Sequence, residues 1–271
     1  MKAHLPSRHI SLPLDAEVLH HQEKPIQSLL KPLLELAEHS DYLIAGSAGE
    51  FTDGDGIFQI PRFIFMGPGG GGETQRLGIF ATFHGDEPVG AQALVEFLQV
   101  LEIRPWLAKG YHLYVYPVCN PTGFLAQSPG NFSGEDLTRH FWRGSSQPEI
   151  YYLEREIGVL RFQGVISFYT QSDSESFAVN IANSVILNRS LAGPAIQAAQ
   201  RFLPGSAFRA ESLPGPRDFL TTGNELDPTP FELHCGIPAR APRPSQIHGS
   251  VGALKSILES YRSLISIGQN I

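Results

Sequence analysis

The sequence is poor in cysteine and carries fewer positive than negative charges. Its 271 residues include only Cys119 and Cys235, too few for a disulfide framework and without the paired spacing of a structural zinc knot. We therefore expect both thiols to be reduced. Twenty Lys and Arg against 27 Asp and Glu give a net charge of -7, which argues against nucleic acid or an anionic membrane surface as a partner.

Long apolar runs are also missing. The first residues, MKAHLPSRHISLPLD, lack the apolar stretch of a signal peptide, and no segment reaches the roughly 18 uninterrupted apolar residues of a membrane span. The cytoplasm is therefore the expected compartment. A hydrophobic share of 42% and a charged share of 17% are ordinary values for a globular chain, and no repeat or linker divides the sequence. One domain spanning residues 1–271 is expected.

Apolar periodicity predicts strands that alternate with helices. The expected strands are 42–46, 56–67, 76–84, 112–118, 164–169 and 230–236, and the expected helices are 25–39, 87–101, 148–161, 193–203 and 250–265. Long loops are expected at 120–134 and 204–230. This order predicts an α/β fold of three layers, α/β/α, around a mixed, mostly parallel twisted sheet, with reactive groups at the carboxyl ends of the strands.

One such strand end carries a potential metal-binding pair. The segment GIFATFHGDEPVG predicts an apolar strand that runs into His84, a turn, and then Glu87 at the start of a helix. An imidazole and a carboxylate three residues apart across a turn can converge on one cation, and zinc accepts both kinds of ligand. Alternatively, His84 bonds the turn and Glu87 only favours the positive end of the helix.

Three further motifs follow in order: YPVCNPTGF at 116–124, NFSGEDLTRHF at 131–141 and PFELH at 230–234. Together with HGDE, their order and spacing resemble the zinc carboxypeptidase superfamily, which includes the aspartoacylase and succinylglutamate desuccinylase branch. The resemblance covers residues 76–235. No single one of these motifs is as specific as the four together.

The resemblance implies one zinc ion, bound by His84 and Glu87. It also implies that Glu232 is the general base and that Arg139 binds the free carboxylate of a substrate, with Thr138 in place of the family's usual asparagine. A zinc-bound water attacks at neutral pH when a nearby carboxylate accepts its proton, which suits this role for Glu232. Without the resemblance, Glu232 would be a polar strand residue and Arg139 a surface ion-pair partner.

The sequence departs from the family at the third zinc ligand. Relatives carry a histidine where this chain has Tyr169, and a phenol must lose its proton before it binds zinc well. Tyr169 could bond a water or simply pack as a buried aromatic. His234, on the same side of its strand as Glu232, and Asp173 are other candidates for the third ligand. Pro129 also replaces an arginine that many relatives use to stabilise the oxyanion.

Two functions follow. The first is a metallohydrolase that cleaves an amide next to a free carboxylate, in a peptide end or an N-acyl amino acid, and that is impaired by Tyr169. The second is a non-catalytic relative that binds a peptide end or a small carboxylate. The GPGGGG run at 67–72 lacks the Gly-Lys-Ser/Thr ending of a phosphate loop, so it is interpreted as a connection without a ligand.

Overall fold

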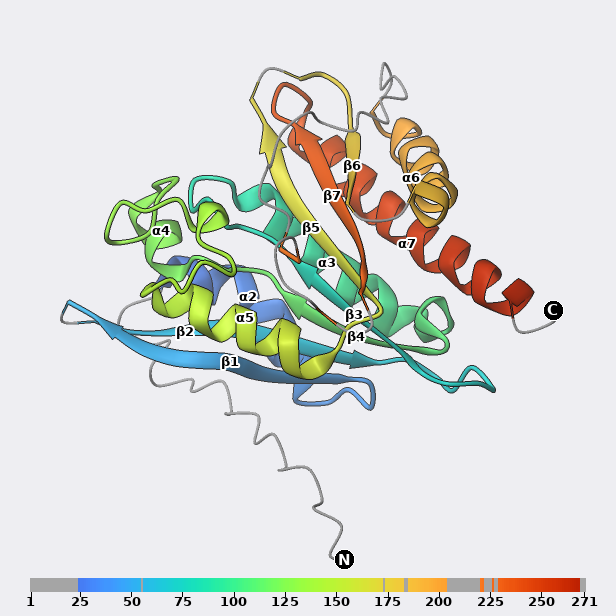
Figure 1. Cartoon of the computed structure of the whole chain (residues 1–271), viewed down its shortest axis with the longest axis horizontal. Helices are drawn as coiled ribbons and strands as arrows, with labels where there is room; N and C mark the ends of the chain where they lie inside the picture. The colour runs from blue at the N-terminus through green and yellow to red at the C-terminus, as the bar shows by residue number, and fades with distance from the viewer. Residues whose placement is uncertain are drawn as a thin grey trace, which may run out of the picture.

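A computed structural model describes residues 24–54, 56–172, 174–182, 185–203, 220–221, 226 and 229–268 of the chain. Its centre is a seven-stranded twisted sheet with helices on both faces (Figure 1). The strands are β1 (Leu43–Asp53), β2 (Gly56–Met66), β3 (Gln75–Phe80), β4 (Tyr111–Tyr116), β5 (Gly164–Gln171), β6 (Ala178–Ala182) and β7 (Phe231–Pro238). The helices are α2 (Lys24–Ala37), α3 (Pro88–Ile103), α4 (Pro121–Ala126), α5 (Pro148–Leu160), α6 (Val185–Gln200) and α7 (Arg243–Gly268), with short 3-10 turns η1 (Pro105–Ala108) and η2 (Leu137–Arg139).

The sheet is parallel in its centre and antiparallel at its flanks. The strand order is β1-β2-β4-β3-β5-β7-β6. Strands β4, β3, β5 and β7 run parallel, while β2 pairs antiparallel with β4, β1 with β2, and β6 with β7. The carboxyl ends of β3 and β5 therefore lie at the same edge, where the loops that follow them meet. This arrangement confirms the expected α/β class with a mixed sheet.

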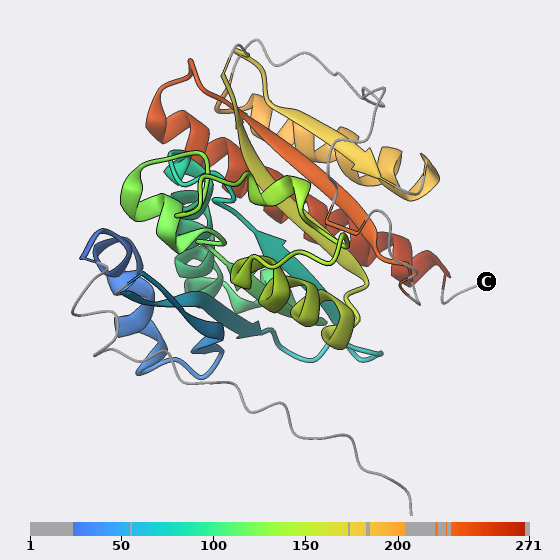
Figure 2. The ribbon, with the colours of Figure 1, turned by 60° about the vertical axis from the view of Figure 1, so that its left-hand side comes forward.

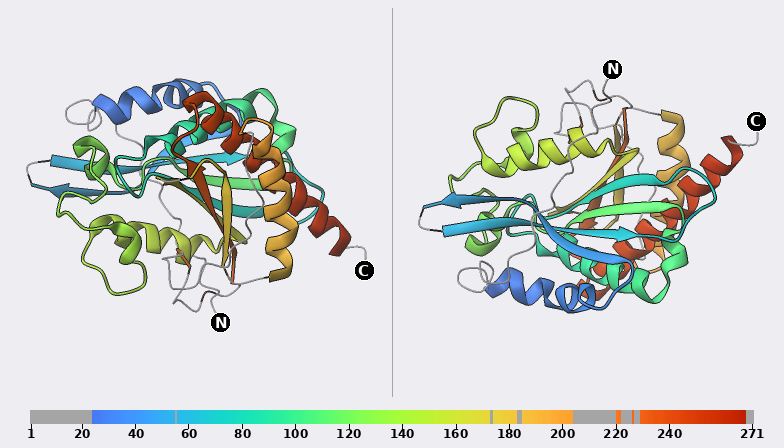
Figure 3. Two further views of the ribbon diagram at one scale, coloured as in Figure 1. Left: turned by 90° about the horizontal axis from the view of Figure 1, so that it is seen from above. Right: turned by 90° about the horizontal axis from the view of Figure 1, so that it is seen from below.

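Two apolar layers hold the helices to the sheet. On one face, α2, α3, α6 and α7 pack on side chains such as Leu77, Ile79 and Ile166. On the other face, α5 places Ile150, Leu153 and Ile157 against the opposite side of the same strands. Figure 2 shows α5 in front of the sheet and α7 behind it, and Figure 3, from above and below, shows α5 and α2 on opposite sides. This is the three-layer order that the alternating pattern predicts.

Several element boundaries differ from the expectation. Helix α6 begins at Val185 and α7 at Arg243, both earlier than expected. The strand β6 and the short helix α4, which begins with Pro121, were not expected. Short elements give too few residues for a period to be counted, which is why the pattern missed them. Within the described residues, no helix is long and apolar enough to cross a membrane.

Candidate functional site

The turn after β3 brings His84 and Glu87 to the carboxyl edge of the sheet, between Phe80, the last residue of β3, and Pro88, the first of α3. The backbone of α4 packs directly on this turn: a Cβ on Gly85 would lie 1.9 Å from the carbonyl carbon of Gly123. The two motifs are thus held together by a contact that only glycine permits at position 85.

Asn120 fixes the same contact with its side chain. Its Oδ1 accepts a hydrogen bond from the Gly123 amide at 2.8 Å and caps α4, while its Nδ2 donates to the Phe83 carbonyl oxygen at 2.9 Å. Asn120 is completely buried, so its amide satisfies backbone groups that water cannot reach. The HGDE and NPTG segments therefore form one rigid corner of the site.

His84 lies between two carboxylates. Its Nδ1 is 3.0 Å from Glu87 Oε1, and its Nε2 is 3.1 Å from Asp136 Oδ1. The other oxygen of Glu87 accepts a hydrogen bond from the backbone amide of Thr170, at the end of β5, at 2.6 Å. His84 and Glu87 are brought together as expected, and the 131–141 segment contributes Asp136 to them.

The two carboxylates favour the protonated imidazole. The hydrogen bond to Asp136 and then the one to Glu87 raise the pKa of His84 to about 10. In return, the bond to His84 holds the pKa of Asp136 well below its usual range, with help from Thr138. Both ring nitrogens of His84 then act as donors.

Asp136 also orders the segment that carries Arg139. Its Oδ1 accepts from the amide and the hydroxyl of Thr138 at 3.1 and 2.7 Å, and its Oδ2 is 3.1 Å from Arg139 Nε. The Arg139 side chain is 73% exposed, so its guanidinium is open to an incoming anion. The sequence interpretation missed Asp136, although it lies three residues before Arg139 in the same motif.

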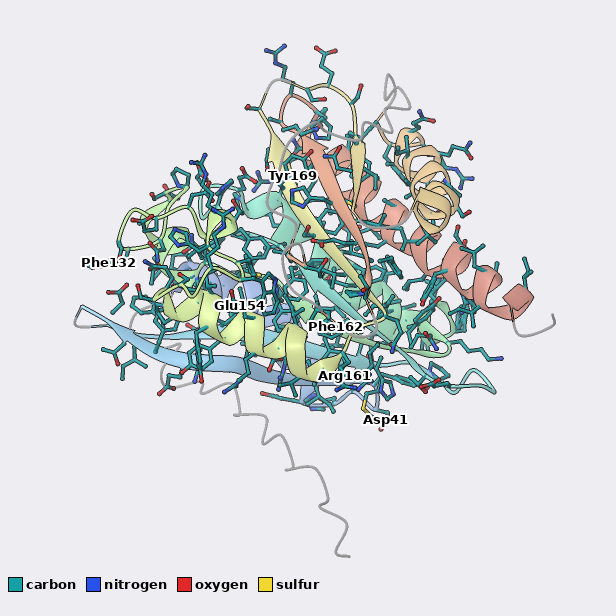
Figure 4. The ribbon with its side chains drawn as sticks, viewed as in Figure 1. Asp41, Phe132, Glu154, Arg161, Phe162 and Tyr169 are labelled. Atoms are coloured by element: carbon teal, nitrogen blue, oxygen red, sulfur yellow. The ribbon has the colours of Figure 1, made fainter. Side chains whose placement is uncertain are left out.

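Tyr169 points away from His84. Its hydroxyl oxygen accepts hydrogen bonds from Asn180 Nδ2 on β6 at 2.8 Å and from Gln171 Nε2 at 2.9 Å. It lies over Gly236 of β7, where a Cβ would be 2.8 Å from it. Because β7 and β6 lie on the side of β5 opposite β3, the phenol extends away from the HGDE turn. Figure 4 shows Tyr169 toward the upper end of β5.

His234 is engaged on the same side of the sheet as Tyr169. Its ring stacks on the Tyr169 ring with centroids 4.2 Å apart, and its Nδ1 is 2.5 Å from Ser167 Oγ. The pairing of β5 with β7 places Ser167 opposite His234, which explains this contact. Asp173, the other candidate ligand, lies outside the described residues.

Glu232 lies deep in the sheet, apart from His84. It pairs with Val165 of β5, whereas Glu87 is bonded to Thr170, five residues further along that strand. Five residues of strand span about 16 Å between their backbones. Among the described residues, no hydrogen bond or ion pair joins Glu232 to the HGDE turn. The local FELH sequence reproduces the family's motif, but the strand pairing decides the depth at which its glutamate lies.

Glu232 instead holds a segment of backbone. Its side chain is completely buried and accepts hydrogen bonds from the Leu220 amide at 2.6 Å, from the Thr221 amide at 3.0 Å and from the Thr221 hydroxyl. Burial raises the pKa of Glu232 to about 7, although these bonds favour the charged form. The Leu220 carbonyl oxygen in turn accepts from Trp142 Nε1 at 2.6 Å. Glu232 thus anchors residues 220–221.

Comparisons with solved structures identify the fold. A metallo-carboxypeptidase from Burkholderia cenocepacia superposes with a TM-score of 0.68 at 14% identity, covering 89% of this chain and 69% of that one. A candidate metallopeptidase from Shewanella amazonensis SB2B gives 0.66 at 19% identity, covering 86% and 92%. The chain has the zinc carboxypeptidase fold. An aspartoacylase family protein from Mesorhizobium loti, at 0.56 and 14% identity over 81% and 68%, represents the other branch with this fold. No family model and no curated sequence matches the chain.

A carboxypeptidase-like fold implies a zinc ion, and the residues at the HGDE turn fit it only in part. The 3.0 Å between His84 Nδ1 and Glu87 Oε1 suits a cation about 2.1 Å from each atom. Tyr169 and His234, however, are bonded elsewhere. Among the described residues, no group of three His, Cys, Asp or Glu side chains is arranged to hold a metal. A catalytic zinc site uses three protein ligands, so the donor set is incomplete.

Proposed function

We propose that this protein recognises a free carboxylate, at a peptide end or in an N-acyl amino acid, and does so without efficient metal-dependent hydrolysis. Arg139 is the recognition group. His84, Glu87 and Asp136 hold the loop that presents it. The observation that carries the proposal is the separation of Glu232 and Tyr169 from the HGDE turn, since a water-activating base and a third ligand would both have to lie there.

The position of Arg139 supports the recognition part. Its guanidinium is largely exposed, and Asp136 fixes only its Nε edge. An oriented guanidinium pairs well with a carboxylate because its remaining N–H groups match the two oxygens. A metallo-carboxypeptidase from Pseudomonas aeruginosa with the same fold was crystallised with a substituted succinic acid, a compact dicarboxylate. That ligand chemistry agrees with a carboxylate as the target of this site.

Binding to matched peptides tests the proposal. We expect short peptides with a free carboxyl end to bind in the presence of a chelator, and the same peptides with an amidated end to bind at least about tenfold more weakly. Arg139→Gln should lose this preference. Arg201→Gln, which removes an equal charge at another exposed position, should keep it. Equal binding of free and amidated ends by the native chain would contradict the proposal.

Hydrolysis is the second candidate, and the His84 and Glu87 geometry favours it. Two candidate zinc ligands already lie close together there. After incubation with zinc, amide cleavage in peptides and N-acyl amino acids is measured by liquid chromatography. Cleavage that is lost on chelation and in His84→Ala would establish the hydrolase and replace the binding proposal.

A further inference from the structure

A cavity lies at the opposite end of β3 from His84. It encloses about 260 Å³ between the glycine-rich segment 67–72, the turn before β4 and the last turns of α7. Its lining includes Gly70, Gly72, Glu73, Lys109 and Arg262. The cavity is smaller than the pockets that hold drug-sized ligands, so its size suits a compact one. Because it lies at the amino-terminal ends of β3 and β4, it is separate from the carboxylate-recognition site.

The glycine-rich segment is an anchored wall of this cavity. A Cβ on Gly67 would lie 1.9 Å from the Ala108 carbonyl oxygen, and a Cβ on Gly70 would lie 2.9 Å from Gly110 Cα. The Gly110 amide donates to the Pro68 carbonyl oxygen at 2.8 Å. Glycine is thus required where two stretches of backbone touch. The run has a packing role that its sequence alone did not indicate.

Arg262 uses one nitrogen of its guanidinium for hydrogen bonds to the backbone, which leaves the edge formed by Nε and Nη2. Its Nη1 donates to the carbonyl oxygens of Trp106 and Lys109 at 3.2 and 3.3 Å, and its charge lies over the Tyr111 ring, 5.9 Å from the centroid. These contacts fix the guanidinium plane. Within the described residues, Nε and Nη2 donate no hydrogen bond, and this is the edge that pairs with two oxygens of a phosphate or carboxylate.

Lys109 adds a second positive charge to the same wall. Its ammonium group has no partner among the residues that the structure describes, and its backbone carbonyl is one of the two oxygens that hold Arg262. Among the described residues that line the cavity, Glu73 is the one acidic residue, against the two cations Lys109 and Arg262. We propose that the cavity binds a phosphate group, or an anion of similar size, between Arg262 and Lys109.

Titration with inorganic phosphate tests this site in the full chain. At constant ionic strength, we expect phosphate to shift the backbone amide resonances of residues 69–72 and 109–111, whereas chloride should not. Glycerol phosphate and citrate distinguish a phosphate ester and a carboxylate from the free ion. The anion that binds at the lowest concentration identifies the source, and the absence of saturable shifts with all three overturns the proposal.

Variants assign the binding to the two cations. Lys109→Gln, at an exposed position, and Arg262→Lys, which keeps the charge but loses the two-donor edge, should each weaken phosphate binding about tenfold. Glu73→Gln should tighten it a few-fold, because it removes an opposing charge. Arg201→Gln is the control for charge alone. Unchanged affinity in both Lys109→Gln and Arg262→Lys would contradict the assignment, even if phosphate bound elsewhere on the chain.

Discussion

Asp136 and Glu232 are carboxylates in two of the motifs that resemble the zinc carboxypeptidase superfamily. Their surroundings shift their pKa values in opposite directions. Asp136 is 31% exposed and forms hydrogen bonds with His84 and Thr138, so its pKa falls. Glu232 is completely buried, and burial raises its pKa although the hydrogen bonds from the described residues Leu220 and Thr221 lower it. Asp136 therefore remains charged at the edge of the site, while Glu232 anchors backbone inside the sheet. The neighbours of a carboxylate, rather than the motif that contains it, thus decide its charge and its role.

The contact between Asp136 and His84 orients the His84 ring and connects two segments of the site. A carboxylate on the far nitrogen of a histidine fixes the orientation of the ring and makes the ring more basic, as is common around metal-binding histidines. Here it also connects the HGDE turn to the Arg139 segment across 52 residues of sequence. Asp136 is thus a positioning residue for both halves of the proposed recognition site.

The largest expected effect is on stability, from Glu232→Ala. Removing the carboxylate leaves the amides of Leu220 and Thr221 without their acceptor, which we expect to cost about 2–4 kcal/mol of unfolding free energy at pH 5. Urea unfolding measures it, with the exposed Glu259→Ala as the matched control. If Glu232→Ala kept its stability but lost peptide binding, the assignment of Glu232 as an anchor would be wrong.

A smaller effect is expected from Tyr169→His, which places at position 169 the histidine that the resemblance implies as third ligand. Position 169 precedes Thr170, whose amide contacts Glu87, so an imidazole there can turn toward the HGDE turn. We expect zinc affinity to rise about tenfold or more, whereas Tyr169→Phe, which adds no ligand, should leave it unchanged. Competition with a fluorescent chelator measures both. Equal affinities in all three proteins would show that metal binding does not depend on position 169.

The smallest expected effect is a difference in pH dependence. The raised pKa of Glu232 stabilises the fold below about pH 4.5, and this contribution is lost as the pH rises through about 7. The stability gap between the native chain and Glu232→Ala should therefore be roughly 1–2 kcal/mol larger at pH 5 than at pH 8.

Asp136 should show the opposite dependence at acidic pH. Its lowered pKa contributes stability above about pH 4, and that contribution is lost as the pH falls further. The gap between the native chain and Asp136→Asn should thus shrink toward pH 3, and it should also narrow as the pH rises above about 6.5, because the raised pKa of His84 depends on Asp136. Urea unfolding at pH 3, 5 and 8 measures both variants. Parallel profiles for the two variants would remove the distinction between the carboxylates.

The sequence predicted the fold well because its central segments are strongly periodic. Strand β3, helix α3 and strand β4 all occur where apolar spacing placed them, and the turn between β3 and α3 contains His84 and Glu87. The short strand β6 was not predicted because five residues are too few to show a regular apolar spacing. That omission also hid Asn180, the partner that draws Tyr169 away from the HGDE turn.

The depth of each residue in the sheet could not be predicted from motifs. The resemblance points to both Glu232 and Arg139, and among the described residues the Arg139 segment reaches His84 through Asp136. A strand's register depends on its pairing with a distant neighbour, and shifting it moves every side chain along the sheet. The pairing of β7 with β5, which sets Glu232 beside Val165, therefore fixes the position of Glu232. The FELH sequence contains no information about that pairing.

The most direct test of the central claim is the zinc content of the purified native chain after loading with excess zinc and dialysis. The separation of Tyr169 and Glu232 from His84 and Glu87 predicts well under one zinc per chain and no amide cleavage. One tightly held zinc per chain, with cleavage of carboxyl-terminal peptides, would contradict it.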